Sequence, residues 1–228
     1  MKSLYLVDFD HTISKRDVWD SIIRMFAPDE WKEILDSYLR GDISSRICNI
    51  RLAKLIQPRE EEARKMVYSI GIDPTFHHFV NWIEDKNVEM IIVSDGYDYY
   101  IDLLLQSEGL SYLTYFSNRM VWTDRGIEVE FPLYKQDCEK DMAHCKCQHV
   151  VEKEGARRVY IGDGVSDVCA ATRCETIYAK RNLLDHCLKN HVPCTPFDDF
   201  HDVIRGEENF WNEVKSAEAV SPAVKNDE

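Results

Sequence analysis

The chain has 228 residues, of which 44% are hydrophobic and 30% charged, a composition typical of a soluble globular protein with one sizeable core or a core plus a small inserted unit. Its net charge of −13 argues against a nucleic-acid-binding surface, and an anionic ligand would need a locally positive site. No apolar stretch approaches membrane-spanning length and no signal peptide is visible, so the cytoplasm is the expected location. A homodimer is compatible with the sequence, which leaves the oligomeric state open.

Four short apolar runs lack the alternation of half-buried strands and therefore predict buried parallel strands: residues 4–9, 88–93, 158–161 and 176–179. Helical patterns separate these runs, including one at residues 147–153 directly before the third strand. The alternation of strands and helices predicts an α/β fold with a doubly wound parallel sheet.

The first interruption of this alternation, residues 14–71, contains helical patterns only. Apolar stripes at helical spacing, with Pro28 before one helix and Ser44 or Ser45 as the cap of another, predict four helices. Nearly sixty such residues (14–71) are too many for one crossover helix, so they predict a small helical lid. The expected division is a helical cap at 14–74, a core domain at 1–13 and 75–212, and a disordered tail at 213–228.

A second interruption lies at residues 115–134. Apolar and polar residues alternate on both sides of the turn Asp124-Arg125-Gly126. Alternation around a turn that contains glycine predicts a β-hairpin.

Acidic, hydroxyl and glycine residues follow three of the predicted strands. The first strand leads into Asp8 and Asp10, the second into Ser94, Asp95 and Gly96, and the third into Gly162, Asp163, Gly164 and Asp167. Because ligands bind beyond the carboxyl ends of the strands in open α/β sheets, we expect these residues to share one site. Asp8 and Asp10 point to the same side and would repel each other, so a bound cation is the simplest way to hold them.

The residue types at this edge suit phosphoryl transfer with Mg²⁺. Three hard oxygen ligands are available: the carboxylates of Asp8 and Asp163 and the backbone carbonyl of Asp10. Ser94 and the backbone amide of Gly96 can donate to an anion, and Lys146 is the candidate counter-charge. Positioning and charge neutralisation of this kind do most of the work in phosphoryl transfer.

Together these residues resemble the motifs of the haloacid-dehalogenase-type (HAD) phosphatase superfamily over roughly residues 1–205. The matching positions are Asp8-Phe9-Asp10-His11-Thr12, Ser94, Lys146 and the segment from Gly162 to Asp167. The helical insertion directly after the first motif resembles the helical-bundle cap (C1 type) of this superfamily. Haloacid dehalogenases themselves lack the second aspartate of the first motif, so Asp10 favours a phosphatase.

This resemblance implies a role for each matching residue. Asp8 is the expected nucleophile, which forms an aspartyl-phosphate, and Asp10 is the expected acid–base partner. Thr12 is expected to orient the loop. The residues expected to bind phosphate or substrate are Ser94, Asp95, Gly96, Lys146 and Ser166. The expected metal ligands are Asp8, Asp10, Asp163 and Asp167, and Asp167 could instead support Lys146.

Residues 41–46, 91–98 and 195–203 resemble more closely the 2-hydroxy-3-keto-5-methylthiopentenyl-1-phosphate phosphatases of methionine salvage. That resemblance implies a small phosphorylated metabolite as the substrate. Phosphoserine phosphatases and a phosphocholine/phosphoethanolamine phosphatase are the alternatives, because both are similar to that subfamily. The spacing from Cys138 to Cys145 and Lys146 resembles the phosphocholine enzyme, and Ser166 stands where phosphoserine phosphatases usually carry Asn.

Three further interpretations remain open from the sequence. Asp17 lies where phosphoserine phosphatases use a Glu to grip substrate, but Ser14-Lys15-Arg16-Asp17 also fits a helix capping box. Cys138, Cys145 and Cys147 could bind structural zinc, although their spacing is not that of a standard zinc knuckle. A phospho-accepting receiver domain would also have an acidic pocket with Ser and Lys, but the helical insertion and Asp10 argue against it.

Overall fold

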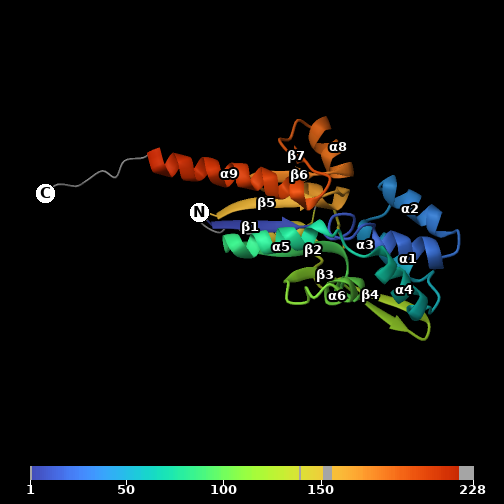
Figure 1. Cartoon of the computed structure of the whole chain (residues 1–228). Helices are drawn as coiled ribbons and strands as arrows, with labels where there is room; N and C mark the ends of the chain where they lie inside the picture. The colour runs from blue at the N-terminus through green and yellow to red at the C-terminus, as the bar shows by residue number, and fades with distance from the viewer. Residues whose placement is uncertain (1, 139, 151–155, 221–228) are drawn as a thin grey trace.

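The structure is a computed structural model of the chain, and it describes residues 2–138, 140–150 and 156–220. Figure 1 shows a layer of strands with helices on both faces, and a separate group of helices, from residues 18 to 70, beyond one end of the strands. Among the described residues, no helix is both long and apolar enough to cross a membrane.

One sheet of seven strands forms the centre of the described structure. The strands are β1 Lys2–Val7, β2 Glu89–Tyr97, β3 Tyr115–Thr123, β4 Gly126–Glu130, β5 Ala156–Gly162, β6 Thr176–Ala179 and β7 Thr195–Pro196. Their order is β4-β3-β2-β1-β5-β6-β7, and all neighbours are parallel except β3 and β4. This arrangement confirms the predicted doubly wound α/β fold.

The helices form two groups. They are α1 Val18–Phe26, α2 Trp31–Leu39, α3 Ser45–Ala53, α4 Glu60–Ile70, α5 Thr75–Lys86, α6 Asp98–Ser107, α7 Val168–Ala171, α8 Arg181–Lys189 and α9 Phe200–Val220, with the 3₁₀ helices η1 Lys146–His149 and η2 Val165–Asp167. Helices α1 to α4 make up the insertion beyond the strand ends, and α5 to α9 lie on the two faces of the sheet. Tyr5 and Val7 of β1 lie in one apolar cluster with residues of α5, α6 and α9, whereas Leu4 and Leu6 lie in a second cluster with residues of α7 and α8. Successive strand residues point to opposite faces, so a strand covered on both faces requires an unbroken apolar run.

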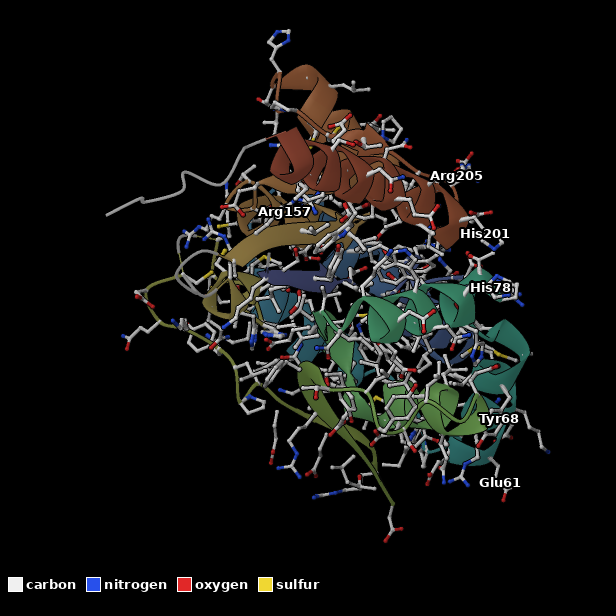
Figure 2. The ribbon with its side chains drawn as sticks, turned by 60° about the vertical axis from the view of Figure 1, so that its left-hand side comes forward. Glu61, Tyr68, His78, Arg157, His201 and Arg205 are labelled. Atoms are coloured by element: carbon white, nitrogen blue, oxygen red, sulfur yellow. The ribbon has the colours of Figure 1, made fainter. Side chains whose placement is uncertain are left out.

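A buried acidic residue fastens α9 to the sheet. Glu207 accepts hydrogen bonds from Tyr5 Oη at 2.5 Å and from Arg157 Nη1 at 2.7 Å. Nearer the start of α9, His201 lies beside His78 of α5, with 2.6 Å between their ring nitrogens (Figure 2).

The chain enters and leaves the helical insertion at adjacent points. Ser14 and Ile72 form an antiparallel bridge, and the Asp73 amide donates to the Ile13 carbonyl at 2.8 Å. The four predicted helices of the insertion are α1 to α4, and the Ser44 hydroxyl caps α3 by accepting from an amide of its first turn. We propose that residues 14–74 form a cap over the core domain.

The predicted hairpin is present and is also part of the main sheet. β3 pairs in parallel with β2, where Ile92 faces Tyr115, and then antiparallel with β4, where Trp122 faces Ile127. The alternation in the sequence identifies the two hairpin strands and their turn, but it carries no information about the third strand beside them.

The expected disordered tail from residue 213 is wrong in its first part, because α9 continues to Val220. Residues 212–220 are rich in Ala, Glu and Lys, which are strong helix formers, and they extend an already anchored helix. Residues 221–228 lie outside the described residues. Of the helix expected at 147–153, the structure has only the short η1, and residues 151–153 also lie outside the described residues.

Candidate active site

A cavity of about 410 Å³ opens between the carboxyl ends of the strands and the helices of the insertion. Its core side contains most of the residues predicted from the strand ends: Asp8, Asp10, Ser94, Asp95, Gly96, Asp163, Gly164 and Ser166. Lys146 bonds to Asp8 and Asp167 directly behind this wall. The sheet topology therefore brings residues from three separate strand ends to one place.

Asp8 and Lys146 form a buried ion pair at the end of β1. Lys146 Nζ donates to Asp8 Oδ1 at 2.5 Å and to Asp167 Oδ1 at 2.6 Å, and its side chain is 1% exposed. Burial lowers the pKa of Lys146, but the charges of Asp167 and Asp8 outweigh it and raise the pKa above its usual value. Lys146 is therefore a fixed cation against the face of Asp8.

Asp167 is held by four donors. Lys146 Nζ and Tyr160 Oη donate to its Oδ1, and the backbone amides of Asp163 and Gly164 donate to its Oδ2. Because a carboxylate offers about four acceptor positions, these bonds use the whole side chain. Gly162 allows this approach, since a Cβ there would lie 2.5 Å from Asp167 Oδ2. Asp167 thus fixes both Lys146 and the loop after β5.

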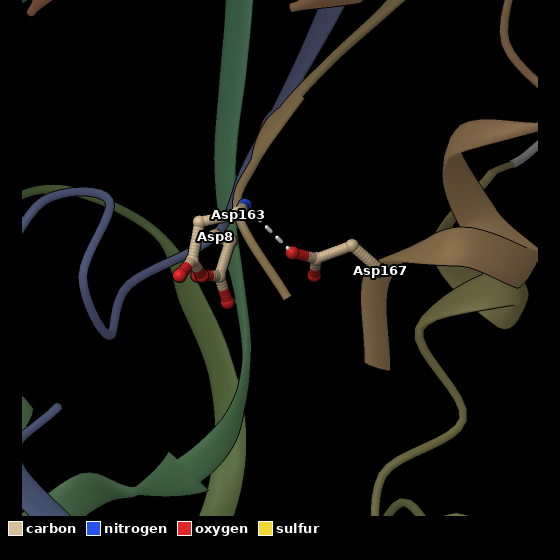
Figure 3. A group of neighbouring side chains, drawn as sticks. All are labelled: Asp8, Asp163 and Asp167. Carbon is tan, nitrogen blue, oxygen red and sulfur yellow. Dashed lines mark hydrogen bonds between the residues drawn. The ribbon is translucent and has the colours of Figure 1, made fainter. Parts of the chain in front are cut away.

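Asp8, Asp163 and Asp167 form the one metal-type cluster found in the described part of the chain, with a carboxylate oxygen of each within 4.8 Å of the others (Figure 3). Burial, together with the charges of neighbouring carboxylates, raises the pKa of Asp8 to about 7 and that of Asp163 to about 8, although the charge of Lys146 opposes the rise. A divalent cation with hard oxygen ligands would relieve this repulsion, so the donor set fits a metal site of the Mg²⁺ type.

Asp10 has partners that differ from those of Asp8. Its Oδ1 accepts from the Val18 amide at 2.8 Å, and its Oδ2 accepts from Tyr100 Oη at 2.8 Å. Burial raises the pKa of Asp10 well above its usual value, the charge of Asp17 raises it further, and the hydrogen bond from Val18 opposes the rise. Asp8 and Asp10 are two residues apart, yet only Asp8 touches Lys146.

The end of β2 forms the opposite side of the core wall. Ser94 Oγ accepts from the Gly96 amide at 3.0 Å. Asp95 Oδ1 accepts from the His144 amide at 2.7 Å, and its Oδ2 accepts from the Ser45 hydroxyl at 2.9 Å. The Asp95 carboxylate is thus engaged in fixing the loop and in contacting α3 of the insertion, while Ser94 and Gly96 line the cavity.

Two of the predicted residues behave differently from their neighbours. The Thr12 hydroxyl is buried and has no hydrogen-bond partner within the described structure. Asp17 is itself the N-cap of α1, accepting from the Asp20 amide at 2.7 Å, so the capping box from Ser14 to Asp17 is wrong. Burial raises the pKa of Asp17 to about 6, and its side chain also lines the cavity.

The insertion supplies a largely apolar wall to the cavity. Its apolar members are Trp19, Ile23, Trp31, Leu35, Tyr38, Leu39, Cys48 and Leu52. Asp20 and Arg24, joined by an ion pair, add polar groups to this side. The cavity therefore has a charged floor on the sheet and an apolar roof.

Several contacts at the site are not evident from the sequence. Tyr100 bonds Asp10, and Arg181 Nε lies 3.2 Å from Asp163 Oδ2. Arg181 lies two residues after the end of β6, so the rule that places ligands at strand ends would have found it if applied to the fourth predicted strand. Tyr100 carries no such signal, because its contact depends on which way α6 turns.

Among the described residues, the cysteines near Lys146 form no group of three that could hold a metal ion, although Cys145 interacts with both Cys138 and Cys147. Cys147 Sγ lies 2.8 Å from Cys169 Sγ, and His144 Nε2 lies 2.7 Å from His149 Nε2. The zinc alternative for Cys138, Cys145 and Cys147 has no support from this arrangement. Cys147, next to Lys146, instead packs against the apolar cluster that contains residues of α7 and α8.

Residues 3–185 match the family described as Putative Phosphatase. The chain belongs to this family. It is similar to two proteins named 2-hydroxy-3-keto-5-methylthiopentenyl-1-phosphate phosphatase. With that of Brevibacillus brevis it is 27% identical, over 93% of this chain and 98% of the relative. It is 28% identical to the protein of Bacillus thuringiensis subsp. konkukian, over 86% of this chain and 91% of that relative.

The chain also matches the bifunctional enzyme MtnB/MtnX of Bacillus licheniformis, with 33% identity over 90% of this chain and 49% of that enzyme. These matches to the phosphatase family and to named phosphatases confirm that the protein is a phosphatase and confirm the resemblance predicted from its motifs.

Solved structures with the same fold include phosphoserine phosphatases. A phospho-aspartyl intermediate analogue and a substrate-bound complex each give a TM-score of 0.68 at 20% identity, covering 90% of this chain and 98% of the other. A HAD family hydrolase, t0658 from Salmonella enterica serovar Typhi, gives a TM-score of 0.61 at 17% identity, and the match covers 81% of this chain and 65% of that hydrolase. The phosphatase therefore has the HAD fold that its motifs predict.

Proposed function

We propose that this phosphatase is a Mg²⁺-dependent phosphomonoesterase in which Asp8 attacks phosphorus and forms an aspartyl-phosphate. The observation that carries the proposal is the different environment of the two neighbouring aspartates. Asp8 lies against Lys146 and Asp163, whereas Asp10 is held by Val18 and Tyr100. These surroundings support nucleophilic attack by Asp8 and proton transfer by Asp10.

In the first half of the proposed reaction, an Asp8 oxygen bonds to phosphorus while the bond from phosphorus to the leaving oxygen breaks. Asp10 gives its proton to that leaving oxygen. In the second half, Asp10 takes a proton from water as the water oxygen attacks phosphorus and the bond to Asp8 breaks. In this proposal, Lys146 and the Ser94 hydroxyl neutralise and orient the phosphoryl oxygens, and the Gly96 amide would join them by turning away from Ser94 Oγ.

The proposed ligands of Mg²⁺ are the Asp8 and Asp163 carboxylates and the Asp10 backbone carbonyl. When bound, Mg²⁺ would neutralise charge on the phosphate and keep Asp8 ionised despite its raised pKa. Asp167 is better suited to hold Lys146 than to bind the metal directly, because four donors already occupy its oxygens.

The proposed substrate is a small phosphorylated metabolite in the cytoplasm, with 2-hydroxy-3-keto-5-methylthiopentenyl-1-phosphate as the first candidate. The similar enzymes that carry this name support the choice, and so does the apolar roof formed by residues such as Ile23, Leu35 and Leu52. A methylthio group is apolar and would lose its contact with water against this wall.

A phosphoalcohol with a cationic tail is the second candidate. Asp17, Asp20, Trp19 and Trp31 all line the cavity, and carboxylates with aromatic faces suit an ammonium such as that of phosphocholine or phosphoethanolamine. Phosphoserine is a third candidate, because the solved structures with this fold include phosphoserine phosphatases.

The test is kcat/KM for phosphate release with Mg²⁺ over a panel containing the salvage enol-phosphate, phosphoserine, phosphocholine and phosphoethanolamine. We expect turnover that EDTA abolishes and added Mg²⁺ restores, with the enol-phosphate preferred. A preference for phosphoserine or phosphocholine would overturn the substrate choice. Labelling of the protein in a single turnover without phosphate release would instead favour a receiver-like signalling domain and overturn the enzymatic proposal.

A further inference from the structure

Tyr100 is a buried tyrosine that the reaction steps above do not use. It lies on α6 and is 0% exposed. Its ring packs against those of Phe9 and Tyr97, with 6.2 Å and 6.3 Å between the ring centroids. Its hydroxyl donates to Asp10 Oδ2 at 2.8 Å. Most buried phenols have a hydrogen-bond partner, and the partner of Tyr100 is the proposed acid–base group.

The Asp10 carboxylate is held from two directions. Tyr100 on the core holds Oδ2, and the Val18 amide at the start of α1 holds Oδ1. Each carboxylate oxygen accepts one of these bonds and keeps a second lone-pair direction for a proton. Two donors fix the plane of the carboxylate and therefore the direction in which that proton points.

The backbone of Gly96 passes so close to the hydrogen bond between Tyr100 and Asp10 that no side chain fits at this position. A Cβ at Gly96 would overlap the Tyr100 hydroxyl and would lie 2.5 Å from Asp10 Oδ2. The glycine thus allows the end of β2 to pass directly over the bond between Tyr100 and Asp10. The Tyr100 hydroxyl cannot move away without displacing a fully buried ring.

We propose that Tyr100 is a positioning residue, which holds the Asp10 carboxylate so that its proton faces the leaving oxygen of the substrate. This inference rests on the proposed function, because it takes Asp10 as the acid–base group. Tyr100 keeps its own proton in both half-reactions. Asp10 alone gives a proton to the leaving oxygen and later takes one from water, as described above.

Positioning of an acid matters only when the leaving group needs a proton. An alkoxide is a poor leaving group and requires protonation as its bond to phosphorus breaks, whereas p-nitrophenolate is stable as an anion and does not. Loss of the Tyr100 hydroxyl should therefore slow the first half-reaction with an alkyl phosphate but not with p-nitrophenyl phosphate. The second half-reaction, in which Asp10 activates water, should be slowed with both.

The experiment compares Tyr100→Phe with a matched control, Tyr97→Phe. Tyr97 is equally buried and lies three residues away, but its hydroxyl has no hydrogen-bond partner in the described structure. For Tyr100→Phe we expect kcat/KM on ethyl phosphate to fall by about 10- to 100-fold, which is part of the roughly 10²- to 10⁴-fold that general acid catalysis contributes. On p-nitrophenyl phosphate, kcat and KM should fall by the same factor, so kcat/KM should stay within about twofold of the wild-type value. A burst of p-nitrophenol should accompany this change, because the second half-reaction is then rate-limiting.

We expect Tyr97→Phe to resemble the wild type on both substrates. Equal losses of kcat/KM on both substrates for Tyr100→Phe would overturn the proposal, and so would kinetics identical to those of the control. Unfolding of Tyr100→Phe but not of Tyr97→Phe, seen in their melting temperatures, would also overturn it, because the hydroxyl would then be structural.

A double-mutant cycle with Asp10→Asn gives a second measurement. If Tyr100 acts through Asp10, then Tyr100→Phe should cost little further kcat/KM on ethyl phosphate once Asp10 is replaced. An equal, additive loss in the Asp10→Asn background would overturn the proposal. Failure of the proposed function itself is distinguishable, because the wild type would then release no phosphate from either substrate.

Discussion

The two sides of the cavity are built by different forces. On the sheet side, Asp8, Lys146 and Asp167 are buried charges whose polar atoms bond to named partners at 2.5–3.0 Å. On the side of α1 to α3, residues such as Ile23 and Leu35 contribute apolar surface. Charge-assisted hydrogen bonds fix direction, whereas apolar contact is non-directional and depends on area and shape.

This difference suggests a division of labour. Reaction at phosphorus tolerates little misplacement, so the groups proposed to carry it are locked in place. Selection of the leaving group needs only a complementary surface, which the helical side can provide without altering the floor. Two hydrogen bonds join the sides, one from the Val18 amide to Asp10 and one from the Ser45 hydroxyl to Asp95. They link the helices that would contact the leaving group to the residues proposed to react at phosphorus.

Removing the proposed nucleophile should have the largest effect. Asp8→Asn is expected to lower kcat by about 10⁴-fold or more, as replacement of a nucleophile does in other enzymes. Because Asn keeps the shape of the side chain, the fold should persist in circular dichroism spectra. The exposed Asp36 on α2 provides the matched control, and Asp36→Asn should retain full activity. Turnover by Asp8→Asn at the wild-type rate would contradict the assignment.

Removing the cation of the cavity floor should reduce stability as well as activity. Lys146→Met leaves Asp8 and Asp167 buried without their cation, and we expect a loss of about 3–5 kcal/mol in the free energy of unfolding. Urea unfolding in EDTA measures it without interference from bound metal.

A second substitution tests this explanation. In Lys146→Met/Asp167→Asn, the Asn oxygen can still accept from the amides of Asp163 and Gly164, and its NH₂ can donate to Tyr160. The double variant should therefore be more stable than Lys146→Met alone. If it is no more stable, an unpaired carboxylate at Asp167 is not the cause of the loss.

The sequence predicts the floor of the cavity better than its surroundings. Asp8 and Asp10 could be placed because they follow an apolar strand directly, and strand ends meet at one edge whatever the details of packing. Lys146 lies on a short 3₁₀ helix, where no periodic pattern predicts its position, so only the resemblance to a motif identified it.

Other contacts depend on geometry that local patterns do not encode. Tyr100 reaches Asp10 because of the direction of α6, and Arg181 reaches Asp163 from a backbone with a positive φ of 50°. The roof could be predicted as helical from its apolar stripes, but not which members of each stripe face the cavity. For that reason the choice of substrate is less determined by sequence than the chemistry.

The buried imidazoles behind Ser94 should make stability depend on pH. Burial lowers the pKa of His144 to about 3 and that of His149 to about 4, each also affected by nearby positive charge. Unfolded histidines take up protons at a pKa of about 6.5, so the unfolded state binds more protons between these values. The stability contribution of these neutral imidazoles is therefore complete above about pH 7 and decreases as the pH falls below 6.5.

His149→Phe removes the share of His149, because Phe retains the stacking of ring 149 on Phe116 and cannot bind a proton, although it also removes the contact with His144. Between pH 7 and pH 5, the wild type should lose about 1–2 kcal/mol more unfolding free energy than the variant. His191→Asn, at an exposed position, should leave the slope unchanged. Parallel slopes for the wild type and His149→Phe would show that this imidazole is not held neutral.

A change in the roof should give the smallest effect, and it should appear in selectivity alone. Leu35→Ala removes apolar surface from the cavity wall and leaves the floor untouched. We expect kcat/KM for hexyl phosphate to fall about 5- to 10-fold relative to ethyl phosphate, in line with the modest discrimination that a few methylene groups allow. Leu188→Ala, on an exposed residue of α8 outside the cavity, should leave this ratio unchanged. Equal losses on both substrates would show that the roof affects the chemistry, so the two sides of the cavity would not act separately.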